Sequence, residues 1–439
     1  MDNQTLFDLE IITLQTKQQK DENRCIFDIF NKTQTRGGRY ALERYFKPRR
    51  ISIKKIEAMQ NVFCFILNDY DNWNLFYNAI GNNLVKNAEN YINENISCIS
   101  PSKHRFAFLK AYWWRFQDKN TYSIIAGGLK CVLNLLQNIN RFHKIVDQDN
   151  CPQLIKKIFR DIKLFSKNDQ LIKTNTSGES SPIQVFRLDT LLRGQLKHII
   201  QSIIKSIYEM DAILSLATAI KEYSLVFPKF IESPFPIFNV RGLYHPFIND
   251  PVRNSISIEK NNNFVFLTGP NLAGKSTFIK ACGIAVYLAH IGLGVPAEEM
   301  ELSCFDGLIT SINTEDNIRA GYSYFYSEVK RMKEIAEQCK SGKNIFVIID
   351  ELFKGTNHRD AYDASLTVIS SMMGYKDHIF LLSTHLSELL KDIKKYRNII
   401  FNYFDAELEN GKPFYKYALK KGVSFQRLGM IIFKNENIF

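Results

Sequence analysis

The hydrophobic pattern of this 439-residue chain changes once, near residue 235. Over residues 24–160 apolar positions recur three or four apart with few breakers, as in "ISIKKIEAMQNVFCFIL" at 51–67. This spacing puts the apolar side chains on one face of a helix, so it predicts a helical region. A polar stretch at 168–184 predicts a loop. Residues 188–223 then predict one amphipathic α-helix, about 50 Å long at roughly 1.5 Å per residue.

Beyond Pro228, Pro234 and Pro236 the pattern changes to short apolar, β-branched runs that alternate with helical stretches. The runs are "FVFLTG" (264–269), "DGLITSI" (306–312), "NIFVIID" (344–350) and "HIFLLST" (378–384). Continuous apolar strands separated by helices are typical of a parallel sheet with both faces covered. The predicted fold class is therefore α + α/β, with an all-helical domain at 1–233 and an α/β domain at 234–439.

The formal net charge of +12 is concentrated in the helical half of the chain. Residues 1–235 carry 33 Lys and Arg against 23 Asp and Glu, whereas residues 236–439 carry 24 against 22. A basic excess confined to one region suits a polyanion such as DNA. Because the basic residues are dispersed, a merely solvated surface is the alternative.

Several features predict a cytoplasmic protein without a membrane segment. The eight cysteines form no CxxC pair and have no histidine cluster beside them, which favours reduced thiols over zinc or disulfides. The N-terminus "MDNQTLFDLE" lacks the basic-then-apolar layout of a signal peptide. The apolar run at 281–297 contains His290 and Pro296 and is shorter than the roughly 20 residues of a membrane span, so we expect a core helix there.

The segment "GPNLAGKS" (269–276) matches G-x-x-x-x-G-K-[ST], follows an apolar strand and opens a helix. Its glycines permit backbone angles that let successive amides point at phosphate oxygens, and the helix N-terminus adds partial positive charge. Lys275 is expected between the β- and γ-phosphates as a catalytic group, with Ser276 as a Mg²⁺ ligand. The expected nucleotide-binding residues are Gly269, Pro270, Asn271, Leu272, Ala273, Gly274, Lys275, Ser276 and Thr277.

Two other strand ends supply candidate catalytic groups. The strand in "NIFVIIDELFKGT" should carry Asp350 and Glu351 to the carboxyl edge of the sheet, beside the phosphate loop. Asp350 can hold Mg²⁺ through its water shell and Glu351 can polarise the attacking water, while a helix-cap role is the alternative. His385, at the end of "HIFLLSTH", is expected to contact the γ-phosphate, with a structural histidine as the alternative.

The motifs "TGPNLAGKST", "DELFKGTNHRDAYDASL" and "LLSTH", in that order, resemble the ABC-like P-loop ATPase domain of the MutS family of DNA mismatch repair proteins. Segments 26–63 and 207–230 resemble the family's helical core and its return helix. "GYSYFYSEVKRM" (321–332) resembles the family's serine-aromatic-glutamate segment. The resemblance implies that Ser323 reaches the γ-phosphate bound by the opposite subunit, with Glu328 close by.

The same resemblance implies a homodimer through the ATPase domain, ATP and Mg²⁺ as ligands, and a helical core and lever that ATP closes on DNA. The family's N-terminal mismatch-reading and connector domains have no counterpart in the sequence, so we expect weak or no preference for a mismatch. We therefore expect a DNA-binding ATP hydrolase of mismatch repair, or of related processing of distorted or branched DNA. The alternative is a P-loop ATPase subunit of a protein complex without direct DNA contact.

Overall fold

The computed structural model describes residues 1–12, 24–47, 52–81, 83–94, 112, 115–146, 150–166, 181–259, 261–313, 324–409 and 412–424. The chain forms two compact units. The helical unit contains Phe30–Lys47 and Asn61–Ala219, and the sheet unit contains Met1–Ile29, Pro48–Gln60 and Ile220–Phe439. Two early segments thus group with the sheet unit, although a single division at residue 233 assigns them to the helical domain.

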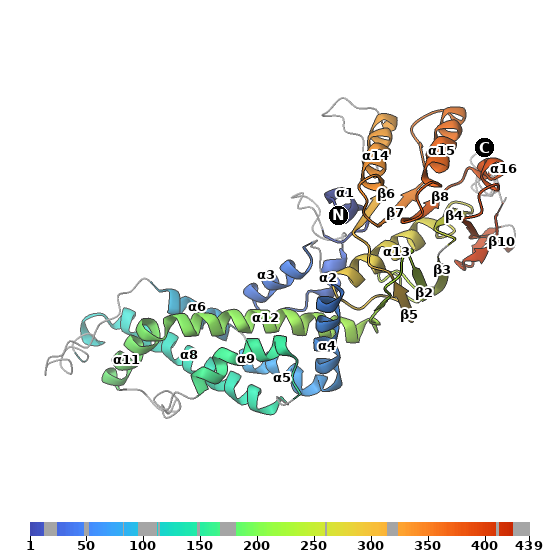
Figure 1. Cartoon of the computed structure of the whole chain (residues 1–439). Coiled ribbons are helices and arrows are strands. Elements are labelled where there is room, and N and C mark those ends of the chain that lie inside the picture. The colour runs from blue at the N-terminus through green and yellow to red at the C-terminus, as the bar shows by residue number, and fades with distance from the viewer. Residues whose placement is uncertain are drawn as a thin grey trace. The chain divides into compact units, whose positions relative to one another are not determined.

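The helical unit is built around α8, which packs against α5, α6, α9 and α11 (Figure 1). Its own helices are α3 (Arg36–Tyr45), α5 (Tyr70–Ile80), α6 (Leu84–Asn93), α8 (Lys119–Ile145), α9 (Gln153–Ser166) and α11 (Pro182–Asp189). The boundary between the units falls within α2 (Ile26–Phe30), α4 (Ile53–Asn68) and α12 (Lys197–Glu222). In α4, Ile56, Phe63 and Ile66 are buried, which confirms the helical spacing seen at 51–67.

The prediction of one α-helix over 188–223 is wrong. A π-helical turn, Thr190–Gln195, separates α11 from α12, and the amide of Leu196 donates to the carbonyl of Leu191, five residues earlier. A π-turn accommodates an extra residue in a helix, and its wider spacing cannot be read from an apolar pattern. With 26 residues, α12 is about 39 Å long instead of about 50 Å.

The sheet unit contains a six-stranded sheet in the order β12-β9-β4-β8-β7-β6, parallel except for β12. Its strands are β4 (Phe264–Thr268), β6 (Gly307–Ser311), β7 (Ile345–Asp350), β8 (Ile379–Ser383), β9 (Ile399–Tyr403) and β12 (Lys420–Lys421). All four predicted strands are confirmed, and β4, β7 and β8 are buried throughout, which explains their unbroken apolar sequences.

Helices cover both faces of this sheet. α13 (Lys275–His290) contacts β6, β7 and β8, while α14 (Tyr324–Cys339) and α15 (His358–Met372) share an apolar core with the strands on the opposite face (Figure 1). The short helix α1 (Asn3–Asp8) packs beside β6. A 3₁₀ turn, Ser387–Leu389, and α16 (Leu390–Ile393) follow β8.

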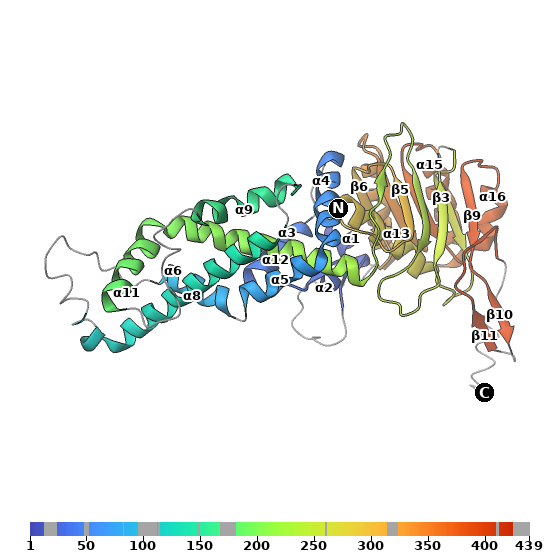
Figure 2. The ribbon, with the colours of Figure 1, turned by 90° about the horizontal axis from the view of Figure 1, so that it is seen from below.

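A second sheet of four strands, β1-β5-β2-β3, was not expected from the sequence. Its strands are β1 (Lys229–Phe230), β2 (Phe238–Leu243), β3 (Asn254–Ile258) and β5 (Glu299–Leu302). β2 runs antiparallel to both neighbours. Figure 2 shows that the hairpin of β10 (Ala406–Glu409) and β11 (Lys412–Tyr415) projects away from the six-stranded sheet. Within the described ranges, no helix is both long and apolar enough to cross a bilayer.

Candidate nucleotide site

The loop 269–274, which connects β4 to α13, has a conformation that depends on its glycines. Gly269 has φ +143°, and a Cβ there would lie 2.4 Å from the carbonyl oxygen of Phe404, so no side chain fits. Gly274 (φ +101°) caps α13 without any side-chain hydrogen bond to the helix. The first amides of α13 therefore remain available to a ligand at this end of the helix.

Lys275 is the first residue of α13 and places a buried ammonium group at this loop. The residue is only 5% exposed, and its Nζ donates to the carbonyl oxygens of Gly269 at 2.8 Å and Pro270 at 3.0 Å. Burial lowers the pKa of Lys275, while the carboxylates of Glu351 and Asp350 act in the opposite direction. Carbonyl groups orient the ammonium group without neutralising it, so its charge can serve an anionic ligand.

The strand register brings the acid pair to the same edge of the sheet as the loop. On β8, Ser383 is the register partner of Leu267 on β4 and also of Asp350 on β7. The ends of three adjacent parallel strands are therefore level. Asp350 is buried, and its Oδ1 accepts a hydrogen bond from the hydroxyl of Ser383.

Glu351 is held in an uncommon conformation at the end of β7. Its φ of +63° lies in the left-handed region, and its amide donates to the carbonyl of Ser383 at 2.9 Å. Its Oε1 lies 3.5 Å from Nδ1 of His385, and its Oε2 lies 3.4 Å from Nζ of Lys354. The interaction with His385 and the charges of Lys354 and Lys275 lower the pKa of Glu351 to about 2, although burial opposes them. The carboxylate is therefore ionised at neutral pH.

One cavity of about 790 Å³ is shared by the loop and Glu351. Residues 271, 272 and 274–278 line it together with Glu351. Another part of its wall comes from segments far away in the sequence, namely Leu243, Tyr244, His245, Ile248, Asn249, Asp250, Pro251, Val252, Asn254, Phe404 and Tyr417. Burial lowers the pKa of His245 to about 4, so this wall contributes a neutral ring at physiological pH.

Sequence reasoning missed this second wall and the contact of Lys354 with Glu351. The side-chain Nδ2 of Asn254 donates to the carbonyl of Tyr417 at 3.0 Å, and its Oδ1 accepts from the backbone amide of Leu419 at 2.7 Å. These two hydrogen bonds join the two distant segments. No motif marks these positions. A clue is available only for Lys354, whose place three residues after Glu351 allows contact within a tight turn.

The predicted site residues are placed as follows. Lys275 and Ser276 lie at the start of α13, with Ser276 exposed on the cavity lining, and Asp350 and Glu351 lie at the end of β7. His385 follows β8 with its side chain 55% exposed and faces Glu351. Ser323 lies outside the described residues.

The donor atoms at this edge suit Mg²⁺ bound together with a phosphate. The serine hydroxyl of Ser276 and the carboxylate of Asp350 are the oxygen ligands that this ion prefers, usually alongside substrate phosphates and water. Among the described residues no group of three or more His, Cys, Asp and Glu side chains could hold a metal ion alone.

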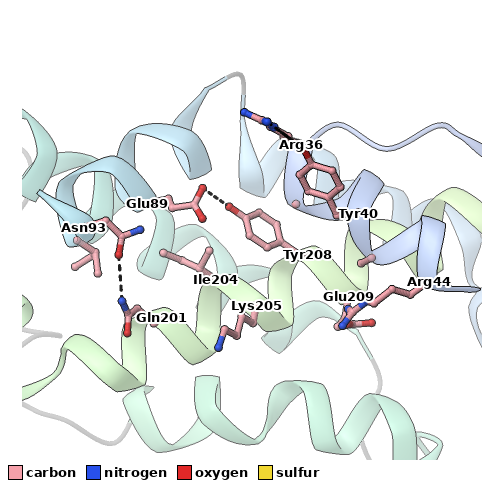
Figure 3. A pocket seen from close by; sticks show the side chains of 13 residues that line it. Arg36, Tyr40, Arg44, Glu89, Asn93, Gln201, Ile204, Lys205, Tyr208 and Glu209 are labelled. Carbon is pink, nitrogen blue, oxygen red and sulfur yellow. Dashed lines mark hydrogen bonds and ion pairs between the residues drawn. The ribbon is translucent and has the colours of Figure 1, made fainter. Parts of the chain in front are cut away.

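The helical unit has its own groove of about 760 Å³ between α3, α6 and α12 (Figure 3). The hydroxyl of Tyr208 donates to Glu89 at 2.6 Å, and Arg44 is paired with Glu209. None of the residues that line this groove belongs to the predicted nucleotide-binding motifs, whereas Lys275, Ser276 and Glu351 from two of those motifs line the sheet-unit cavity. We therefore assign the candidate site to the sheet-unit cavity.

Comparison with known proteins finds sequence similarity to DNA mismatch repair proteins. Residues 265–438 match the family described as MutS domain V. The chain is 30% identical over 245 residues to the DNA mismatch repair protein MSH3 of Candida glabrata, which covers 54% of this chain and 24% of that protein. It is 30% identical over 285 residues to the DNA mismatch repair protein MutS of Lysinibacillus sphaericus (60% and 31%), and 31% identical over 230 residues to that of Anaplasma phagocytophilum (52% and 27%).

These matches cover about a third or less of the length of each relative. The family match begins at Val265, within β4, and therefore includes most of that strand, the glycine loop and the acid pair. The mixed α/β architecture of the sheet unit is consistent with that domain. Residues 265–438 thus match MutS domain V, and the chain is similar to MutS and MSH3 proteins over 54–60% of its length.

Proposed function

We propose that the chain binds and hydrolyses ATP in the sheet-unit cavity. The observation that carries this proposal is that Lys275, Ser276 and Glu351 line one cavity at level strand ends. In that arrangement loop 269–274 acts as a P-loop, with Lys275 and the first amides of α13 at the phosphates. Val252 and Tyr417 lie on the same cavity wall and offer apolar and aromatic surface for the nucleobase.

The side chains then have distinct roles in hydrolysis. Ser276 and Asp350 are the proposed Mg²⁺ ligands, and the ion would offset the charge that develops on the phosphates. Glu351 accepts the proton of the attacking water, a role that requires the ionised carboxylate described above. His385, which lies beside Glu351, would contact the γ-phosphate, and the ammonium group of Lys354 would stabilise the ionised form of the same carboxylate.

We further propose that the ATPase domains of two copies form a homodimer on DNA. The MutS and MSH3 relatives are named as DNA mismatch repair proteins, and the excess of basic residues in the first half of this chain suits a phosphate backbone. Ser323 of each subunit would complete the site of the other, and ATP would switch the helical unit on DNA. The physiological role is then mismatch repair or related processing of distorted or branched DNA in the cytoplasm.

A second candidate function is an ATPase that acts within a protein complex and does not touch DNA. The dispersion of the basic residues along the helical half favours this reading. The first function requires that the purified chain binds DNA, and the second does not.

Electrophoretic mobility-shift assays with matched duplex DNA and with four-way branched DNA test the proposal. The assays include Glu351→Gln, which is expected to bind ATP without hydrolysing it. We expect binding whose affinity falls by about tenfold or more between roughly 50 and 200 mM salt, because bound phosphates release counterions. Absence of a shift on both DNAs at low salt, in a protein that still hydrolyses ATP, would support the protein-complex function instead.

A further inference from the structure

Helix α14 is fixed in the sheet unit by a buried polar network with α1. Asp8, at the end of α1, is fully buried and accepts hydrogen bonds from Thr310 Oγ1 at 2.6 Å and from the amides of Ile312 at 3.0 Å and Asn313 at 3.1 Å. These contacts join α1 to β6 and the residues that follow it. Since every donor has a defined partner, α1 holds this edge of the sheet in one arrangement.

Arg331 connects α14 to the same network. Its Nε donates to the carbonyl of Thr310 at 2.8 Å, and its terminal nitrogens contact Asp2 at 2.8 Å and Thr5 Oγ1 at 3.2 Å. The guanidinium group is buried, and a buried charge with several fixed hydrogen bonds permits little movement of its helix. α14 is therefore anchored on the side of α1 and β6.

One turn earlier on α14, Glu328 contacts the loop that follows the proposed catalytic carboxylate. Glu328 is 5% exposed, and its Oε1 and Oε2 accept hydrogen bonds from the amides of Lys354 at 3.0 Å and Gly355 at 3.3 Å. Both carboxylate oxygens are thus engaged by main-chain groups of the same chain. The ring of Phe325 adds a second contact, with its centroid 5.7 Å from that of Phe353.

The contacted loop has a conformation that requires such support. Glu351 and Phe353 both have left-handed backbone angles, with φ of +63° and +57°. For residues other than glycine this conformation is disfavoured, because Cβ comes too close to the following carbonyl oxygen. It persists only where surrounding contacts enforce it. Lys354, whose amide is bound by Glu328, also places its Nζ 3.4 Å from Oε2 of Glu351.

We propose that Glu328 is a positioning residue for ATP hydrolysis, which holds the 353–355 loop so that Glu351 faces the cavity and Lys354 stays beside it. The inference rests on the proposed function, because it takes Glu351 as the base. It also gives Glu328 a task within its own subunit, instead of a place beside the nucleotide of the opposite subunit. Glu328 itself does not line the cavity.

The test compares steady-state ATP hydrolysis and ATP binding in Glu328→Gln and in a matched control, Glu337→Gln. Glu337 is on the same helix but exposed, 3.9 Å from Lys333. In Glu328→Gln the side-chain oxygen can still accept one of the two main-chain hydrogen bonds, but the side-chain NH₂ group is a donor and cannot accept the other. We expect kcat to fall about tenfold while KM and the affinity for a fluorescent ATP analogue change by less than about twofold, because geometry is disturbed and the phosphate contacts are not.

A kcat for Glu328→Gln equal to that of Glu337→Gln, or a loss confined to KM, would overturn the inference. Should Glu328→Gln unfold, Phe325→Leu, which replaces the ring that contacts Phe353 but keeps an apolar side chain against the core, is expected to lower kcat in the same direction, and an unchanged kcat there would also overturn the inference. The proposed function fails separately, if Glu351→Gln hydrolyses ATP like the unmodified chain.

Discussion

Each unit buries a cluster of charged side chains, and the two clusters differ in how their charges are balanced. In the helical unit Arg193 donates to both oxygens of Asp189, at 2.6 and 2.7 Å, and the hydroxyl of Tyr91 donates to Asp189 at 2.7 Å. In the sheet unit the ammonium group of Lys275 is held by two uncharged carbonyl groups. In the first cluster the cation forms a direct ion pair, whereas the ammonium group of Lys275 is bound by carbonyl groups and interacts with Glu351 and Asp350 through electrostatics alone.

This difference separates structural from functional polar groups within one chain. A buried ion pair whose hydrogen bonds are made within the protein favours one conformation, and its polar groups are not available to a ligand. A buried charge without a direct ion-pair partner costs free energy, and such groups cluster at functional sites, where a charged substrate can bind them. Changes around Tyr91, Asp189 and Arg193, here called the Tyr91 cluster, should therefore affect folding. Changes around Lys275 should affect nucleotide chemistry.

The largest expected effect concerns Glu351. Glu351→Gln keeps the shape of the side chain but removes the proton acceptor, so ATP turnover should fall by about 10²–10⁴-fold while Mg²⁺-dependent ATP binding persists. Single-turnover hydrolysis and equilibrium binding measure the two quantities. Since Glu351 is ionised well below neutral pH, the unmodified chain should show no loss of activity from its protonation between about pH 5 and 8. Normal turnover in the variant would remove Glu351 from the mechanism.

A smaller effect is expected from two adjacent glycines of α8. A Cβ on Gly128 would lie 2.6 Å from Cβ of Tyr91, whereas a Cβ on Gly127 would meet nothing within 4 Å. Gly128→Ala should lower the free energy of unfolding by about 1–3 kcal/mol through overpacking. Gly127→Ala should raise it by about 0.5–1 kcal/mol, because alanine favours helix.

Chemical denaturation of both variants measures these values, and ATP hydrolysis per folded molecule should be unchanged in each. If Gly128→Ala were as stable as Gly127→Ala, the Tyr91 cluster would not be rigid. A selective loss of ATP turnover in Gly128→Ala would contradict the separation between structural and functional clusters.

Sequence reasoning could predict the parts of the site that are local in the chain. The strand ending at Thr268, the glycine loop and the acid pair after β7 are each defined by a few consecutive residues, and the structure brings them to one edge. The cavity wall that joins Val252 to Tyr417 could not be predicted, because its segments lie about 165 residues apart and carry no motif. The π-turn before α12 and the contact of Glu328 with the amide of Lys354 likewise depend on tertiary packing.

Equilibrium binding of ATP, with and without Mg²⁺, to the unmodified chain and to Lys275→Ala tests the central claim most directly. Lys333→Ala, which removes an exposed lysine of α14, is the control. We expect saturable binding strengthened by Mg²⁺, about 100-fold weaker in Lys275→Ala and unchanged in the control, because Lys275 supplies charge-assisted contacts to the phosphates. Failure of the unmodified chain to bind ATP, or equal affinity in Lys275→Ala, would contradict the account.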